Sequence, residues 1–106
     1  VTSMTHYDEN NKSCGHLYLL RLNEKDEAFR NEVIIKMAEK GVATNVHYKP
    51  LPMHTAYKDL GFKMEDYPNA FDMYKNEITL PLHTLLTDED IKYVVGRLNE
   101  SLDELK

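Results

Sequence analysis

Four side chains that can bind or transform a ligand lie within eight residues of the chain. They are His47, Tyr48, Lys49 and His54, which bring together two imidazoles, a phenol and an ammonium. The run that holds them starts as a β-type segment after Gly41 and stops at proline, and sites are often built where fixed backbone gives way to a surface loop. The cluster predicts an edge that binds a polar ligand. Because it lacks a complete catalytic set, we predict no catalytic residue in this chain.

Lys49 raises the question of a covalent nucleophile. A lysine attacks a carbonyl only when its amine is deprotonated, which requires desolvation or a neighbouring cation. Lys49 stands between Tyr48 and Pro50, in what we expect to be an exposed turn. We therefore predict a solvated ammonium that contacts an anionic ligand.

The histidines allow several interpretations. His47 and His54 are zinc-ligand types, but a zinc site needs three or four ligands, and the other histidines are scattered with no HExxH pattern. We therefore predict no metal site. His47 could contact a substrate or cofactor, act as a general base because the pKa of imidazole lies near neutrality, or simply end a strand and hydrogen-bond locally. His83 would lie at the same binding edge as His47 if the predicted strand before His83 were the neighbour of the predicted strand that leads to His47.

Short strands and amphipathic helices must position these side chains. The β-type runs are residues 16–22, 43–48 and 78–82. A helix over 26–40 starts at the N-cap residue Asp26, a short helix spans 54–60, and another opens at Pro68. Thr87 and Asp90 have the spacing of a capping box, so the last helix starts there and keeps its apolar spacing to Leu105.

These elements predict an α/β fold, more closely an α+β sandwich in which a small three-stranded sheet packs with amphipathic helices. If the first two strands are parallel, their crossover is right-handed. The third strand lies either between them or at an edge. Residues 1–14 are polar and irregular and are interpreted as a flexible lead-in, and residues 15–106 as the domain.

The composition narrows the classes of function. The net charge of −5, from 13 basic and 18 acidic residues, argues against a nucleic-acid partner, which needs clustered Lys and Arg. The single cysteine, Cys14, excludes an intrachain disulfide. No apolar run approaches the ~20 residues that span a membrane, and no signal peptide opens the chain. We expect a cytoplasmic protein with no membrane partner, whose start at Val1 reflects processing or truncation.

Several linked motifs together resemble the C-terminal domain of the DegT/DnrJ/StrS sugar aminotransferases. The order and spacing match across roughly Gly15 to Leu102, and the linkage makes the resemblance specific where His-Tyr-x-Pro alone would be weak. The motifs are Gly41-Val42-Ala43-Thr44-Asn45-Val46-His47-Tyr48-Lys49-Pro50-Leu51-Pro52-Met53-His54-Thr55-Ala56-Tyr57, Asp66-Tyr67-Pro68-Asn69-Ala70, Ile78-Thr79-Leu80-Pro81-Leu82-His83 and Leu86-Thr87-Asp88-Glu89-Asp90.

The resemblance implies the small domain of the aspartate aminotransferase fold, from a homodimeric pyridoxal-phosphate enzyme of polysaccharide biosynthesis. Such an enzyme moves an amino group, usually from glutamate, onto a nucleotide-linked keto sugar. The resemblance implies that His47 and Tyr48, followed by Lys49 and His54, contact this substrate. The family's N-terminal domain supplies the Schiff-base lysine, the carboxylate facing the pyridine nitrogen and most phosphate contacts, and none of those motifs occurs here. We therefore expect an excised or separately expressed domain that is inactive alone and binds no cofactor by itself.

Two other interpretations remain open at this point. The chain could be a non-enzymatic binding or regulatory module that has kept the aminotransferase-like fold. It could also be a small enzyme that uses His47 as a general base.

Overall fold

The sheet consists of three antiparallel strands in the order β1-β2-β3. The computed structural model describes all 106 residues. Its strands are β1 Thr2–Ser3, β2 Tyr18–Arg21 and β3 Glu77–Leu80. Leu20 of β2 lies opposite Ile78 of β3. β3 is an edge strand of the sheet, yet all four of its residues are buried, so it lies inside the molecule.

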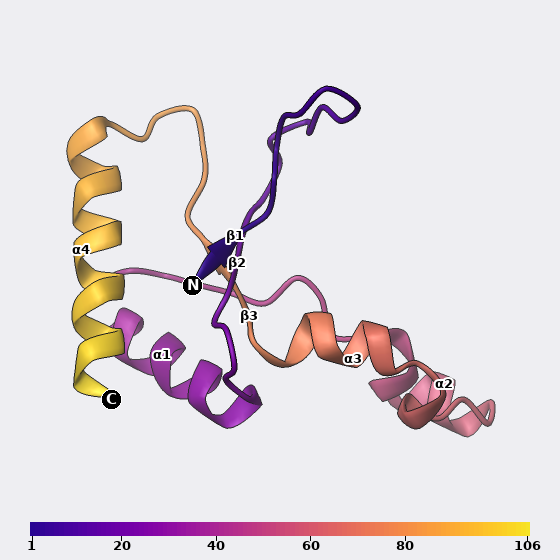
Figure 1. Ribbon diagram of the computed structural model, residues 1–106. Coiled ribbons are helices and arrows are strands. Elements are labelled where there is room, and N and C mark those ends of the chain that lie inside the picture. Colours follow the sequence, from indigo (N-terminus) through magenta and orange to yellow (C-terminus); the bar gives the residue numbers. More distant parts are fainter.

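The helices gather at two ends of the molecule. The α-helices are α1 Glu27–Glu39, α2 Thr55–Asp59, α3 Pro68–Lys75 and α4 Asp88–Glu104, and single 3-10 turns lie at η1 Leu51–Met53 and η2 Met64–Asp66. Helices α1 and α4 pack against each other at one end, and α2 lies at the other end with α3 leading back to the sheet (Figure 1). The segment from His47 to His54 therefore runs from the sheet toward the α2 end.

Capping side chains fix where the two long helices begin. Asp26 Oδ1 accepts a hydrogen bond from the amide of Phe29 at 2.9 Å. Thr87 Oγ1 accepts from the amide of Asp90 at 3.2 Å, and Asp90 Oδ2 accepts from the amide of Thr87 at 2.9 Å. These bonds satisfy amides that the first helical turn leaves free. Both predicted helix starts are confirmed.

One apolar core joins the sheet to α1 and α4. Val33 and Met37 lie four residues apart on α1 and are fully buried, as is Ile78 of β3. The core consists of Leu20, Leu22, Val33, Met37, Val42, Ile78, Leu80 and Leu98. An ion pair joins the C-terminal ends of α1 and α4, because Lys40 Nζ lies 2.9 Å from Glu104 Oε1.

Most of the predicted elements are present with small shifts in their ends. The predicted strands 16–22 and 78–82 are β2 and β3, the short helix 54–60 is α2, and Pro68 opens α3 as its first residue. The α/β class with a three-stranded sheet is confirmed, but the identity of one strand is not.

The predicted strand over residues 43–48 is wrong, because only Asn45 pairs with β3, through an isolated bridge to Thr79. The amides of Asn45 and Thr79 each donate to the other's carbonyl, at 3.2 and 2.8 Å. An antiparallel ladder would next pair His47 with Glu77. Instead the amide of His47 donates to the side chain of Glu77, and the carbonyl of Glu77 accepts from Arg30. Side chains therefore take the positions that a ladder would need.

The third strand comes from the segment interpreted as a lead-in. Thr2 pairs with Arg21 and Ser3 with Leu20, so β1 is part of the sheet. The domain boundary at residue 15 stays a prediction. A right-handed crossover is expected only if the first two predicted strands are parallel. It does not occur, because all three strands are antiparallel to their neighbours. A two-residue edge strand of this kind carries no apolar alternation, which is the signal that sequence patterns depend on. None of the helices is both long and apolar enough to cross a lipid bilayer.

Candidate functional site

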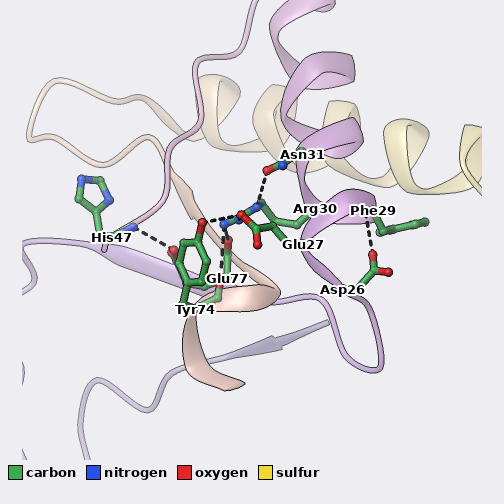
Figure 2. A network of polar contacts seen from close by, with 8 residues as sticks. All are labelled: Asp26, Glu27, Phe29, Arg30, Asn31, His47, Tyr74 and Glu77. Carbon is green, nitrogen blue, oxygen red and sulfur yellow. Dashed lines mark hydrogen bonds and ion pairs between the residues drawn. The ribbon is translucent and has the colours of Figure 1, made fainter. Parts of the chain in front are cut away.

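His47 is held against the buried strand β3 by two hydrogen bonds. Its amide donates to Glu77 Oε2 at 2.9 Å, and its ring atom Nδ1 lies 2.9 Å from Thr79 Oγ1. The residue is half-buried. Backbone and ring are therefore both fixed, so the imidazole has a defined position at the edge of the sheet. Figure 2 shows the contact between the His47 amide and Glu77.

Glu77 and Thr79 are the polar residues beneath His47, and sequence reasoning missed both. Each is only 5% exposed, and Thr79 Oγ1 donates to Glu77 Oε1 at 2.5 Å. Alternate residues of a strand face the same side, so a carboxylate and a hydroxyl two positions apart in a buried strand were a signal of this arrangement. The prediction started the strand at Ile78 and so left Glu77 outside it.

Tyr48 stands beside His47 and is open to solvent. The two rings are nearly perpendicular, at 87°, with their centroids 4.6 Å apart. Tyr48 is 69% exposed, and its phenol makes no hydrogen bond within the protein. His47, Tyr48, Tyr74 and Glu77 are among the residues that line a small hollow of about 100 Å³. Of the four predicted contacts, these two are the ones that the fold brings together at a hollow.

Lys49 and His54 lie in the exposed turn that follows. His54 Nε2 lies 3.3 Å from the carbonyl oxygen of Lys49, which closes the turn around η1. Neither residue lines the hollow beside His47. The expected exposure of Lys49 is confirmed, and its ammonium forms no salt bridge. The predicted role of both residues as substrate contacts stays a prediction.

His83 does not share a hollow with His47. A second hollow, of about 290 Å³, is lined by His47, His16 and Thr79 among others, but His83 is absent from its walls. The exposed His83 ring instead accepts a hydrogen bond from the amide of Leu85, 3.3 Å away at Nδ1. The conditional expectation that His83 faces the mouth of His47 is therefore not met.

A buried arginine supports the other side of Glu77. Arg30 of α1 donates from Nη1 to the carbonyl oxygen of Glu77 at 3.2 Å, and its guanidinium lies 4.8 Å from the centre of the Tyr74 ring. Figure 2 shows Arg30 reaching from α1 toward Tyr74 and Glu77. Tyr74 in turn donates to Glu27 Oε1 at 2.6 Å. Partial burial and this neighbouring carboxylate together raise the pKa of the Tyr74 phenol above its ordinary value.

The groups around His47 do not fit pyridoxal phosphate. The cofactor requires a lysine amine, a free carboxylate for its ring nitrogen and donors for its phosphate. The hollow beside His47 has no lysine in its walls, and both oxygens of its one carboxylate, Glu77, already accept hydrogen bonds from the protein. A metal ion finds no better site, because no group of three or more His, Cys, Asp and Glu side chains stands together.

Comparisons with known proteins agree on one group. The model of the DegT/DnrJ/EryC1/StrS aminotransferase family matches residues 1–99. The chain is 34% identical over 103 residues to the spore coat polysaccharide biosynthesis protein SpsC of Bacillus subtilis, covering 94% of this chain and 26% of that protein. It is 27% identical over 95 residues to the UDP-4-amino-4,6-dideoxy-N-acetyl-beta-L-altrosamine transaminase of Helicobacter pylori, covering 90% of this chain and 25% of that protein.

Solved structures give the same picture at the level of the fold. The PLP form of Spr1654 from Streptococcus pneumoniae, described as a sugar aminotransferase, superposes with a TM-score of 0.94 at 43% identity and covers 98% of this chain. Its apo and PMP forms superpose equally closely, with TM-scores of 0.94 and 0.95. The present chain spans 26% of the length of that protein, close to the share it spans of the curated relatives above.

Proposed function

The chain belongs to the DegT/DnrJ/EryC1/StrS aminotransferase family, and we propose that it is the C-terminal small domain of a pyridoxal-phosphate-dependent sugar aminotransferase. The parent enzyme transfers an amino group, with glutamate as donor, to a keto sugar carried by a nucleotide. Support comes from relatives whose names specify UDP- and dTDP-linked amino sugars. The 26% share of the relatives' length supports the assignment to one domain of a larger protein.

The observation that carries the proposal is the fixed edge at His47 and Tyr48. Two buried residues of β3, Glu77 and Thr79, hold His47 at the mouth of a hollow, and Tyr48 stands exposed beside it. A site needs side chains whose positions are set before the ligand arrives. We propose that His47 and Tyr48 bind the sugar or the nucleotide.

Lys49 and His54 form the outer part of the proposed substrate contact. Both are exposed in the turn next to His47, and Lys49 carries a positive charge that no carboxylate of the chain pairs. The diphosphate of a nucleotide sugar is an anion that such a lysine attracts. The turn therefore supplies charge, whereas His47 and Tyr48 supply directional hydrogen bonds.

The groups that hold the cofactor belong, on this proposal, to the larger N-terminal domain. The walls of the hollow beside His47 offer neither a lysine nor a free carboxylate, so the contribution of this domain is to bind and orient the substrate. The parent acts in the cytoplasm as a homodimer, and its product enters polysaccharide biosynthesis. The 106-residue chain alone does not transaminate.

The experiment uses the protein in which this domain is joined to its cofactor domain. It is incubated with glutamate and UDP- or dTDP-linked keto sugars, and the amino sugar is detected by mass spectrometry. His47→Ala and Tyr48→Phe should raise the KM for the nucleotide sugar about 3- to 10-fold, the worth of one hydrogen bond, and leave the KM for glutamate unchanged. His83→Ala is the matched control, because His83 is exposed and lies outside both hollows that His47 lines.

Each part of the proposal has its own contrary result. Absence of amination with every keto sugar tested would reject the function. An unchanged nucleotide-sugar KM in both His47→Ala and Tyr48→Phe would reject the site while leaving the function. The isolated chain mixed with pyridoxal phosphate should show no lysine-dependent visible absorption band, and a band with turnover would reject the assignment of the cofactor to another domain. A start codon directly before Val1 in the gene would favour a separate binding module.

A further inference from the structure

The hydroxyl of Thr79 has one proton, and the partners of its oxygen decide which of them receives it. Thr79 Oγ1 lies 2.5 Å from Glu77 Oε1. An ionised carboxylate accepts hydrogen bonds and donates none. The other oxygen of Glu77, Oε2, already accepts from the amide of His47 at 2.9 Å. Thr79 is therefore the donor to Glu77, and its proton is not available to any other partner.

The ring of His47 must then donate to Thr79. Its Nδ1 lies 2.9 Å from Thr79 Oγ1, and two atoms at this distance need one proton between them. Because the hydroxyl proton is used at Glu77, the proton in this second bond comes from Nδ1. A neutral imidazole carries a single N–H, so Nε2 is left with a lone pair.

The lone pair of Nε2 reaches solvent. Nε2 has no hydrogen-bond partner within the protein, and it is absent from the buried polar atoms that lack one. His47 is among the lining residues of two hollows. A ligand that reaches Nε2 meets an acceptor rather than an N–H.

From these contacts we infer that Glu77 and Thr79 are positioning residues that hold His47 as the Nδ1–H tautomer and present Nε2 as an acceptor for a hydroxyl of the sugar or ribose. The identity of this donor rests on the proposed function, whereas the tautomer follows from the fold alone. The role of His47 is then selective. It favours a ligand with a donor at this point and disfavours an anionic oxygen, which the neighbouring Lys49 would take instead.

The tautomer is measured by NMR on the protein with 15N-labelled histidine at about pH 8, which lies above the reference value of about 6.5 for histidine in model peptides. Long-range 1H–15N spectra distinguish a protonated ring nitrogen from one with a lone pair, and His47→Ala identifies the signals of His47. We expect a protonated Nδ1 and an unprotonated Nε2. Thr79→Val removes the acceptor with little change of volume and should shift His47 toward the Nε2–H form, whereas Thr79→Ser should keep the wild-type pattern.

Thr44→Val is the matched control for loss of a hydroxyl. The Thr44 hydroxyl is buried without a partner and belongs to the same edge of the molecule, so its removal should leave the His47 signals unchanged. An Nε2–H tautomer in the wild type, or the same tautomer in Thr79→Val, would overturn the inference. Either result is independent of whether the parent protein is an aminotransferase.

The role of the lone pair is measured in the parent enzyme. Thr79→Val should raise the KM for the nucleotide sugar about 3- to 10-fold, corresponding to one hydrogen bond, with little change in the KM for glutamate. Thr79→Ser should keep the wild-type KM, and His83→Ala, which changes a residue outside both hollows, should not alter it. An unchanged KM in Thr79→Val would overturn the assignment of a sugar hydroxyl to Nε2. If the enzyme aminates no keto sugar at all, the proposed function fails and the NMR result for His47 still stands.

Discussion

Replacing Arg30 by methionine should destabilise this domain even though the change removes a buried charge. Arg30 is 1% exposed, and its Nη1 donates to the carbonyl oxygens of Glu77 at 3.2 Å and of Tyr74 at 3.4 Å. Its guanidinium also packs 4.8 Å from the centre of the Tyr74 ring. Methionine retains much of the apolar length of the arginine stem but none of its donors. The variant therefore tests the hydrogen bonds more than the packing.

The magnitude depends on which acceptor loses its partner. The Tyr74 carbonyl keeps the amide of Asn76, so it stays satisfied. The Glu77 carbonyl lies at the edge of β3 where no ladder forms, and loss of a charged donor to a buried acceptor costs about 1.5–3 kcal/mol. Loss of the contact between Arg30 and the Tyr74 ring adds about 1 kcal/mol. Removal of the buried charge returns part of this sum, although Glu27 loses its ion pair with Arg30 at 3.5 Å. We therefore expect a net loss of about 2 kcal/mol in the free energy of unfolding.

Urea unfolding followed by circular dichroism measures this loss. Arg97→Met is the matched control, because Arg97 also lies over a tyrosine ring, 5.1 Å from that of Tyr93, but is about one-third exposed and pairs with Glu100 at the surface. The control should lose less than about 1 kcal/mol. If Arg30→Met were no more destabilising than Arg97→Met, the reasoning that the Glu77 carbonyl depends on Arg30 would be refuted.

Three further predictions concern the core and the last helix. Met37→Ala should lower the free energy of unfolding by about 2–5 kcal/mol, because Met37 is fully buried. Ile35→Ala, on the exposed side of α1, should change it by less than about 0.5 kcal/mol. Similar losses for the two variants in urea unfolding would contradict the assigned core. Thr87→Ala should cost about 1 kcal/mol by removing the cap of α4, measured by thermal unfolding, and an unchanged Tm would contradict it. Hydrogen bonds from Thr87 lower the pKa of the Asp90 carboxyl below its ordinary value. Such a carboxylate stabilises the folded state above its unfolded pKa and loses this contribution as the pH falls through its folded pKa. Asp90→Asn should therefore lose less stability than the wild type on acidification below about pH 4, and equal losses would argue against the capping box.

Local sequence signals were sufficient for the elements whose ends are set by neighbouring residues. Asp26 and Thr87 cap α1 and α4 as predicted, because an N-cap bond spans only three residues of the chain. Val33 and Met37 lie four residues apart, a spacing that places them on one face of a helix, and both are buried in α1. Residues 43–48 have the composition of a strand, but composition does not determine whether the backbone of a neighbouring strand forms hydrogen bonds with them. Here Glu77 offers its side chain instead.

The candidate site divides in the same way. The sequence by itself determined that His47, Tyr48, Lys49 and His54 lie within eight residues of each other, and their order and spacing pointed to the family. Only the tertiary structure decided that His47 and Tyr48 share a hollow while Lys49 and His54 stand outside it. It also brought Glu77 and Thr79 beneath an imidazole 30 and 32 residues earlier in the chain. No local pattern encodes such a contact, because it exists only once β3 is buried against α1 and the chain from Asn45 onward lies along its open edge.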